Sequence, residues 1–284
     1  MPTGHFLPGL KKCVQGGLRR LGLYHRLQAS RVYDLYWRIA DRSIVDAGRK
    51  ELEFYRNLLG EIHPTDLIFD VGANHGTKTE IFLKLGAEVL AVEPDNTNQE
   101  ILRQKFQRYR LHPKPVTILG KALGDTEAVV SMWVDEPGSA KNTLSPKWVN
   151  ILRDDQKRFG HALKFADQQL VETTTLEQLM VKYGVPRFIK IDVEGYENTV
   201  LRGMRRPVPY LSFEVNLPEF RMEGLECIQQ LERVYKEGVF NFAVGCCEGL
   251  VLDRWIAARD FSQILDRCAE KSIEVFWKTS AERL

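Results

Sequence analysis

Short apolar runs alternate with helix-like segments along most of this chain, and that alternation constrains the fold more than any other feature. A run that is apolar throughout is typical of a strand buried on both faces. Strands that alternate with helices predict βαβ units and a mostly parallel, doubly wound α/β sheet. In such a sheet, ligands bind outside the carboxyl ends of the strands. We expect seven strands, at residues 67–71, 88–92, 116–119, 188–191, 211–215, 240–244 and 272–277.

The segment before the first strand has a different pattern. From residue 18 to residue 59, aromatic and aliphatic residues recur at helical spacing, and His63-Pro64 then ends the helix. A chain of 284 residues is long enough for one α/β domain with an appendage. We therefore expect an N-terminal helical extension over residues 1–62 and a main domain over residues 63–284.

A long insertion interrupts the alternation between the third and fourth strands. Two strands, Ala128 to Val134 and Leu170 to Thr173, flank the polar segment 135–167. Long segments of this kind in compact domains are usually functional or disordered. Because its flanking strands return the segment to the carboxyl edge of the sheet, we expect it to act as a lid over the pocket. Trp148 and His161 are its first candidates for contact with a ligand, with core packing as the alternative for Trp148.

Charge and cysteine content exclude several other classes of protein. The chain is 44% apolar and 27% charged, which rules out an intrinsically disordered protein. A net charge of only +2 argues against a nucleic-acid binder. Five cysteines without metal-ligand spacing, and no signal peptide, predict a reducing, cytoplasmic location. Residues 1–31 carry six basic and no acidic side chains, which fits a solvated helix or, alternatively, peripheral contact with an anionic membrane.

The turn after the first strand is rich in glycine but is not a dinucleotide loop. A GxGxxG fingerprint that starts at Gly72 needs glycine at positions 74 and 77, which are Asn74 and Thr77. Gly72 allows a tight turn, Asn74 tolerates a left-handed conformation, and Gly76 lets the next helix start close to a ligand. Asp70 lies just before this turn. The pattern predicts a nucleotide-like ligand without a pyrophosphate group.

The second strand ends in a carboxylate at a position that suits ribose. Glu93 follows the strand 23 residues after Asp70, and an acid at this place can accept hydrogen bonds from both ribose hydroxyls. A nucleoside without a pyrophosphate loop indicates S-adenosylmethionine (SAM) rather than NAD. A nicotinamide-dependent dehydrogenase is therefore the weaker alternative.

Acidic residues follow the fourth and fifth strands. Lys190 and Asp192 lie within or at the end of an otherwise apolar strand, and Glu194 and Glu197 follow in the next turn. Acids at a helix N-terminus are stabilising by about 0.3–1 kcal/mol, which accounts for Glu194 and Glu197. This helix effect accounts less well for Lys190 and Asp192, which lie in or next to a buried strand, where a charge must be paired. Glu214 ends the fifth strand and adds a further carboxylate to the same edge.

With these motifs in order, the sequence resembles the FkbM-type family of SAM-dependent methyltransferases, over about residues 66–245. The matching segments are FDVGANHGTKT (Phe69 to Thr79), VEPDN (Val92 to Asn96), ALGD (Ala122 to Asp125), TTTLEQL (Thr173 to Leu179), IKIDVEGYENTVLRG (Ile189 to Gly203) and FEVN (Phe213 to Asn216).

The resemblance implies a fold, a cofactor and a reaction. The fold is a Rossmann-like, class I methyltransferase sheet of seven strands with an antiparallel last strand. The cofactor is SAM, and the reaction is most often O-methylation of a hydroxyl on a sugar, polyketide or related natural product, so the partner is a small-molecule or glycan acceptor. Carried over by position, the cofactor-binding residues are Asp70, Gly72, Asn74, Gly76, Glu93, Lys121, Ala122 and Asp192. The resemblance also leaves open a protein that binds SAM but has lost catalysis.

The chemistry of the acceptor end allows three roles for Asp192. An alcohol needs a base or a metal ion to become a nucleophile. Asp192 and Glu214 are the catalytic candidates as bases. With Asn216 they also offer three oxygen ligands for Mg²⁺. In the third role, Asp192 only orients the SAM methionine and the Lys190 ammonium.

Overall fold

The computed structural model describes residues 42–107, 116–154 and 163–279. The basic segment 1–31, the helical pattern from residue 18 to residue 41, and His161 lie outside these residues. Among the described helices, none is long and apolar enough to cross a membrane. The helices are α4 (Arg42–Leu59), α5 (Thr77–Leu85), α6 (Asn96–Lys105), α7 (Pro146–Asp154), α9 (Leu176–Tyr183), α10 (Glu197–Arg202), α11 (Arg221–Val234) and α12 (Ala258–Arg267).

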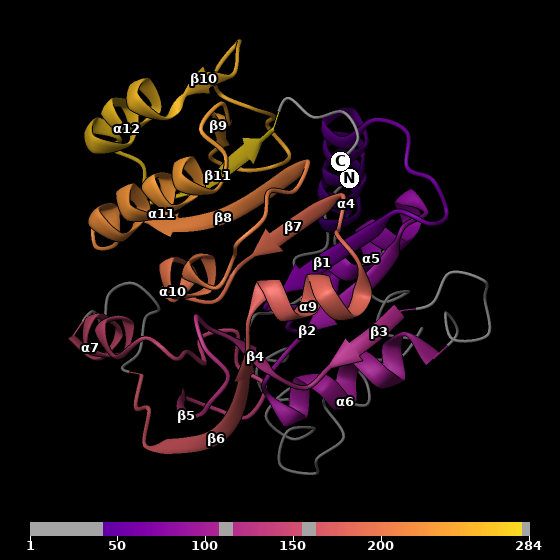
Figure 1. Ribbon diagram of the computed structural model, residues 1–284. Helices are drawn as coiled ribbons and strands as arrows, with labels where there is room; N and C mark the ends of the chain where they lie inside the picture. The colour runs from indigo at the N-terminus through magenta and orange to yellow at the C-terminus, as the bar shows by residue number, and fades with distance from the viewer. Residues whose placement is uncertain (1–41, 108–115, 155–162, 280–284) are drawn as a thin grey trace, which may run out of the picture.

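A large sheet with helices on both faces forms the centre of the molecule (Figure 1). Its strand order is β10-β9-β11-β8-β7-β1-β2-β3. The strands from β8 to β3 in this order pair in parallel, and β11 pairs antiparallel with both β8 and β9. The bounds are β1 (Leu67–Val71), β2 (Glu88–Val92), β3 (Val116–Leu119), β7 (Phe188–Ile191), β8 (Tyr210–Asn216), β9 (Val239–Ala243), β10 (Ile256–Ala257) and β11 (Ser272–Lys278).

The seven predicted strands are confirmed, but the sheet has eight strands. The additional strand is β10, which has two residues and extends the sheet at its edge by pairing Ile256 with Phe240. A strand this short has no periodic pattern that could reveal it in a sequence. The predicted antiparallel last strand is β11.

Side chains cap the starts of two helices near the carboxyl edge. Thr175 caps α9 and accepts a hydrogen bond from the Gln178 backbone N–H. Asp95 caps α6, because its carboxylate accepts hydrogen bonds from the backbone N–H groups of Thr97 and Asn98. An ionised acid binds two N–H groups at a helix start better than a hydroxyl does.

Alternate residues of the strands pack against two separate groups of helices. Phe69 and Val71 pack on one face, with α9, α10, α11 and α12. Ile68 packs on the other face, with α4 and α5. On that second face, the α4 aromatic ring of Tyr55 lies edge-on to Phe82 of α5, with 5.1 Å between ring centroids. The helix expected before the main domain is thus packed directly against the main sheet.

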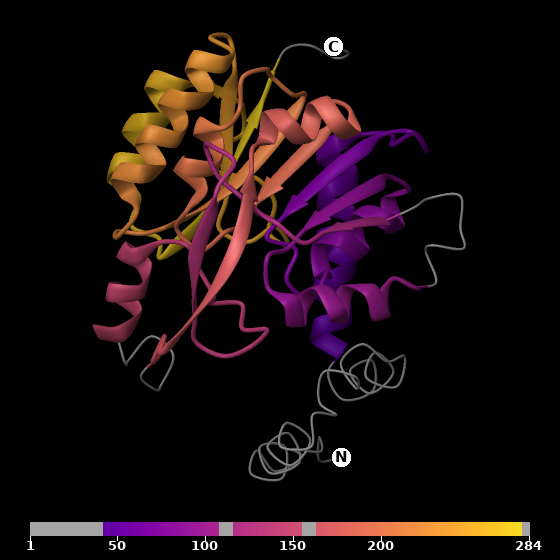
Figure 2. The same ribbon diagram turned by 60° about the horizontal axis from the view of Figure 1, so that its bottom comes forward.

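The predicted insertion forms a small sheet of its own, and its two flanking strands are confirmed. β5 (Val129–Val134) pairs antiparallel with β6 (Asp167–Thr174), and β4 (Ala122–Leu123) pairs with β6 in parallel. Between β5 and β6, the chain bridges back from Thr143 to Trp133 and then forms α7. In Figure 2 the strands of this unit, drawn in magenta and pink, lie in front of the main sheet.

Candidate functional site

A cavity lies at the carboxyl ends of the strands, where the class of fold predicts a ligand. Its walls come from the ends of β1, β2 and β7, from β4 and β5, and from the insertion between β5 and α7. Six of the residues predicted as cofactor contacts line it: Gly72, Asn74, Glu93, Lys121, Ala122 and Asp192. Three other predicted site residues, Asp70, Gly76 and Glu214, are not part of the lining.

Gly72 sits where two turns of the backbone touch. Its φ is +80°, and a Cβ on this residue would lie 1.8 Å from the Asp192 carbonyl oxygen. The turn is tied to the neighbouring strand because the N–H groups of Gly72 and Ala73 both donate to the Val92 carbonyl. Only glycine fits a position with both a positive φ and this close an approach. The Gly72 turn therefore brings the ends of β1 and β7 together at the cavity.

Asp70 and Gly76 support the same turn from behind. The Asp70 carboxylate is buried and accepts a hydrogen bond from the Thr79 hydroxyl at the start of α5. Burial raises the pKa of Asp70, and the nearby Lys190 ammonium opposes that rise. A Cβ on Gly76 would lie 2.5 Å from the Phe106 ring, so Gly76 allows α5 to pack close to the end of α6.

Glu93 is buried at one end of the cavity and is held by two backbone groups. Its carboxylate oxygens accept hydrogen bonds from Asn74 N–H at 2.7 Å and Asp95 N–H at 2.8 Å. Burial is the largest cause that raises its pKa, to about 7. A carboxylate has about four lone-pair positions, so these two bonds leave capacity for hydroxyl donors.

Lys121 and Ala122 lie on the wall of the cavity beyond β3. Lys121 forms an ion pair with Glu172 of β6, with 2.8 Å between Nζ and Oε2. Ala122 is buried against Met132 and Val171 in the small apolar core of the insertion sheet. This wall is therefore apolar and carries a charged pair at its rim.

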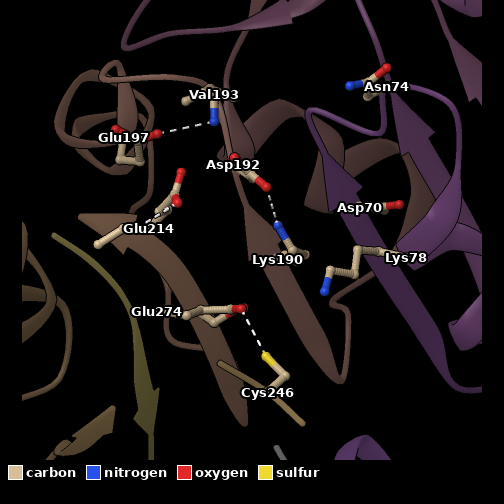
Figure 3. A network of polar contacts seen from close by, with 12 residues as sticks. Asp70, Asn74, Lys78, Lys190, Asp192, Val193, Glu197, Glu214, Cys246 and Glu274 are labelled. Atoms are coloured by element: carbon tan, nitrogen blue, oxygen red, sulfur yellow. Dashed lines mark hydrogen bonds and ion pairs between the residues drawn. The ribbon is translucent and has the colours of Figure 1, made fainter. Parts of the chain in front are cut away.

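The opposite end of the cavity is acidic. Asp192 forms an ion pair with Lys190, two residues earlier on β7, with 2.7 Å between Oδ2 and Nζ (Figure 3). Burial alone would raise the pKa of Asp192, but the Lys190 ammonium holds it below its usual value. Burial lowers the pKa of Lys190, yet the surrounding carboxylates of Asp192, Glu274 and Asp70 raise it above its usual value. Both groups are therefore charged at neutral pH.

Two further carboxylates lie beside Asp192. Carboxylate oxygens of Asp192, Glu194 and Glu214 all lie within 4.8 Å of one another. Burial and the repulsion of the other acids raise the pKa of both Glu194 and Glu214. Glu214 also accepts a hydrogen bond from Ser272 on β11, with 2.7 Å between Oγ and Oε1. Carboxylates without a further indication of an ion do not define a metal centre.

Glu194 lines the cavity, although the sequence pattern assigns it only to a helix start. Its φ of +55° is unusual for a residue other than glycine, and it sets the direction of the side chain. The sequence places Glu194 in the same turn as Asp192, and this is the one signal that could have indicated a position at the cavity. The left-handed backbone conformation of Glu194 has no signal in the sequence.

A buried polar cluster lies on the α4 side of the sheet below this site (Figure 3). At its centre is Glu274 of β11, which accepts hydrogen bonds from Ser212 at 2.6 Å and from Cys246 at 3.1 Å. The Tyr55 hydroxyl of α4 is 3.4 Å from the same carboxylate. This cluster is not predicted from the sequence, because its members come from four distant segments. Its Glu274 carboxylate is one of the three that raise the pKa of Lys190.

The insertion contacts both ends of the cavity. Near Glu93, Asp95 accepts hydrogen bonds from the Asn142 side chain at 2.8 Å and from Gly138 N–H at 3.1 Å. The insertion also reaches the acidic end, where the Trp148 indole N–H donates to the Glu194 carboxylate at 2.9 Å. The Thr143 hydroxyl donates to the Glu194 carbonyl at 2.7 Å.

This strand order, with the antiparallel strand β11 between β8 and β9 and a cavity at the carboxyl edge, defines a Rossmann-like class I methyltransferase fold. The chain belongs to the FkbM methyltransferase family, because the model of the methyltransferase FkbM domain matches residues 70–236. That range lies within the stretch of about 66–245 that the motifs predict.

The individual relatives that follow have low sequence identity to this chain. The hexuronic acid methyltransferase AglP of Haloferax volcanii is 27% identical over 181 residues, which are 63% of this chain and 64% of the relative. This chain thus matches a little under two thirds of that relative's length. The crystal structure of the methyltransferase FkbM from Methylobacillus flagellatus has a TM-score of 0.49 and 16% identity, and covers 78% of this chain and 46% of that chain. An O-methyltransferase from Bacillus cereus, solved with SAH (S-adenosylhomocysteine), has a TM-score of 0.36 and 14% identity. The match covers 81% of this chain and 80% of that chain.

Proposed function

We propose that this protein is a SAM-dependent methyltransferase that methylates a hydroxyl group of a sugar, a polyketide or a related natural product. The observation that carries the proposal is one cavity with a ribose-type carboxylate, Glu93, at one end and the acid Asp192 at the other. The family match and the printed name of the Haloferax relative support methyl transfer, and that name supports a sugar acceptor. They favour this reading over a nicotinamide-dependent dehydrogenase.

The residues of the cavity fit SAM. The capacity left on the Glu93 carboxylate suits the two ribose hydroxyls, and Lys121 and Ala122 border the place for the adenine edge. Gly72 and Asn74 would approach the ribose and the methionine through their backbone, while Asp70 and Gly76 would hold this turn in place. Bound SAM supplies a methyl group on a positively charged sulfonium.

The acidic end of the cavity favours a neutral acceptor. Asp192 is ionised at neutral pH, and two more carboxylates lie beside it, so an acceptor carboxylate there would be repelled. A hydroxyl is neutral, and it needs a base to become a nucleophile. The predicted catalytic pair, Asp192 and Glu214, lies at this end. The proposal contains no Mg²⁺, since the acids alone do not indicate an ion.

A screen of acceptors tests the proposal. Purified protein is incubated with SAM and with methyl glucopyranoside, methyl glucuronopyranoside or macrolide aglycones, and SAH release and product mass are measured. We expect SAH release that depends on the acceptor, with a product 14 Da heavier, as the added CH₂ of O-methylation requires. SAH binding without transfer to any acceptor would indicate the alternative of a SAM-binding protein that has lost catalysis.

The glucuronoside also distinguishes two kinds of methylation. Its sugar ring offers hydroxyls, which would give a methyl ether, and a carboxylate, which would give a methyl ester. Mild alkali hydrolyses the ester and leaves the ether intact. We expect an alkali-stable product, whereas loss of the methyl group in alkali would contradict a hydroxyl acceptor.

A further inference from the structure

Only two of the three clustered acids face the cavity. Asp192 and Glu194 are lining residues, whereas Glu214 lies behind them on β8 and accepts a hydrogen bond from Ser272. A group that takes a proton from a bound acceptor must lie within hydrogen-bond reach of it, directly or through one water. This condition leaves Asp192 and Glu194 as candidates for direct contact.

The partners of these two acids differ. The Asp192 Oδ2 forms an ion pair with the Lys190 ammonium, and this pairing lowers the affinity of the Asp192 carboxylate for a proton. Within residues 42–107, 116–154 and 163–279, no cation forms an ion pair with Glu194. In this part of the chain its Oε2 accepts a hydrogen bond from a neutral donor, the indole N–H of Trp148, at 2.9 Å. Of the two acids at the cavity, Glu194 is therefore the stronger base.

The turn that carries Glu194 is fixed on both sides. Glu197, at the start of α10, accepts a hydrogen bond from the backbone N–H of Val193 at 3.0 Å (Figure 3) and another from that of Gly195 at 3.2 Å. From the insertion, Thr143 donates to the Glu194 carbonyl. Gly195 has a φ of +88°, and a Cβ there would lie 2.6 Å from the Phe220 ring. The Glu194 side chain is thus held in place by groups outside its own turn.

We propose that Glu194 is the general base of the reaction and that Trp148 of the insertion positions it. This proposal rests on the proposed function. The acceptor oxygen forms its bond to the methyl carbon as the carbon–sulfur bond breaks, and that electron pair stays on sulfur, which becomes the neutral thioether of SAH. The hydroxyl proton moves to the Glu194 carboxylate and is afterwards released to water.

The charges around Glu194 determine how the rate depends on pH. Burial raises the pKa of Glu194, and so do the carboxylates of Asp192, Glu214 and Glu197, whereas the Trp148 hydrogen bond lowers it. The Lys190 ammonium of β7 is engaged with Asp192. The active form is the carboxylate. The rate should therefore rise with pH, through a midpoint above the usual range for glutamate.

The first test needs no acceptor. Protein labelled with ¹³C at the glutamate carboxyl carbon is titrated by NMR in the presence of SAH, and the Glu194 signal is assigned as the one absent in Glu194→Gln. We expect a midpoint above the usual glutamate range, and a higher midpoint in Trp148→Phe. A midpoint in the usual range, or one unchanged by Trp148→Phe, would overturn the proposal.

The second test measures transfer to the best acceptor of the screen. Glu194→Gln keeps an oxygen for the Trp148 indole, and its kcat should fall by about 10²–10⁴ while SAH affinity stays within about twofold. Trp148→Phe should move the rising limb of the kcat profile to higher pH. Glu232→Gln, which removes an exposed acid of α11, is the matched control and should leave the profile unchanged.

These measurements separate the two proposals. Absence of SAH binding to the unaltered protein would contradict the proposed function itself. Normal SAH binding and methyl transfer, with full kcat in Glu194→Gln, would contradict only the assignment of Glu194.

Discussion

The Lys190 ammonium lies 2.7 Å from the Asp192 carboxylate, and the side chain of Lys190 is only 4% exposed. Residues two apart in extended backbone point to the same face, and Asp192 is the first residue after β7, two positions beyond Lys190. In parallel register, Lys190 also lies beside Asp70 of β1 and Ser212 of β8. A polar row thus crosses the sheet below the cavity, and Lys190 is its central cation.

Removal of that cation should destabilise the protein. Lys190→Met leaves Asp192 without its partner next to further carboxylates, and breaking a buried pair costs about 3–5 kcal/mol. Because the Asp192 side chain is 35% exposed, we expect a loss near about 3 kcal/mol in urea unfolding. The double variant Lys190→Met/Asp192→Asn should regain part of this loss. A single variant as stable as the unaltered protein would show that the pair is not structurally required.

The Gly72 turn gives a comparison of two glycines. Gly72→Ala combines a positive φ with a Cβ that meets the Asp192 carbonyl, whereas Gly184 has a φ of +100° and nothing within 4 Å of its Cβ position. Strain of this kind costs about 1–3 kcal/mol, so Gly184→Ala should lose about that much stability. Gly72→Ala should lose more and should also bind SAH less tightly. If the two variants lose the same stability and Gly72→Ala keeps its SAH affinity, neither the close approach of Gly72 to the Asp192 carbonyl nor its contact with SAH is supported.

Glu93 should make SAH binding depend on pH. Its pKa is raised to about 7, so below pH 7 a proton must leave before the carboxylate can accept the ribose hydroxyls. The Kd for SAH should therefore fall as pH rises toward 7, by up to about tenfold per pH unit, and then level off. Calorimetry from pH 5.5 to 8.5 measures this, and Glu93→Gln should remove the slope below pH 7. A slope that persists in Glu93→Gln would assign it to another group.

The insertion contacts the two ends of the cavity through different residues, so changes in its two parts should affect different steps. Asn142 lies at the Glu93 end and Trp148 at the acidic end. Shortening residues 135–167 is expected from the sequence to impair transfer and to spare SAM binding. Asn142 donates to Asp95 beside Glu93, however, so the first part lies at the Glu93 end of the cavity, where we propose that the ribose binds. Asn142→Ala removes the hydrogen bond that holds this part of the insertion to Asp95 at the wall of the cavity, and should raise the Kd for SAH about tenfold, which is about 1.4 kcal/mol. Asn150→Ala, an exposed change on α7, should not, and equal Kd values would contradict the division.

The general layout was predictable because it depends on local patterns. The apolar runs, the Gly72 turn, and the positions of Glu93 and Asp192 at strand ends all place residues at one edge of a sheet, and the structure brings them to one cavity. Such inferences need only the strand period and the rule that parallel strands end on the same edge. The roles of these residues in binding and catalysis stay predictions.

What the sequence could not supply depends on contacts between distant segments. Glu274 reaches the buried cluster only because β11 inserts beside β8, and nothing near residue 274 indicates that pairing. Trp148 meets Glu194 through the path of the insertion, which has no periodic pattern. Asp95 caps α6 and also accepts a hydrogen bond from Asn142 of the insertion, a contact 47 residues away in the sequence. In each case the local pattern was compatible with several partners.

The most direct test of the account is calorimetric titration of the purified protein with SAH and, separately, with NADH at pH 8. We expect SAH to bind and NADH not to bind. In Glu93→Ala, loss of hydrogen bonds to a charged group, worth about 1.5–3 kcal/mol each, should weaken SAH binding by one to three orders of magnitude. Absence of SAH binding, or the same SAH affinity in a folded Glu93→Ala variant, would contradict the assignment of this cavity to SAM.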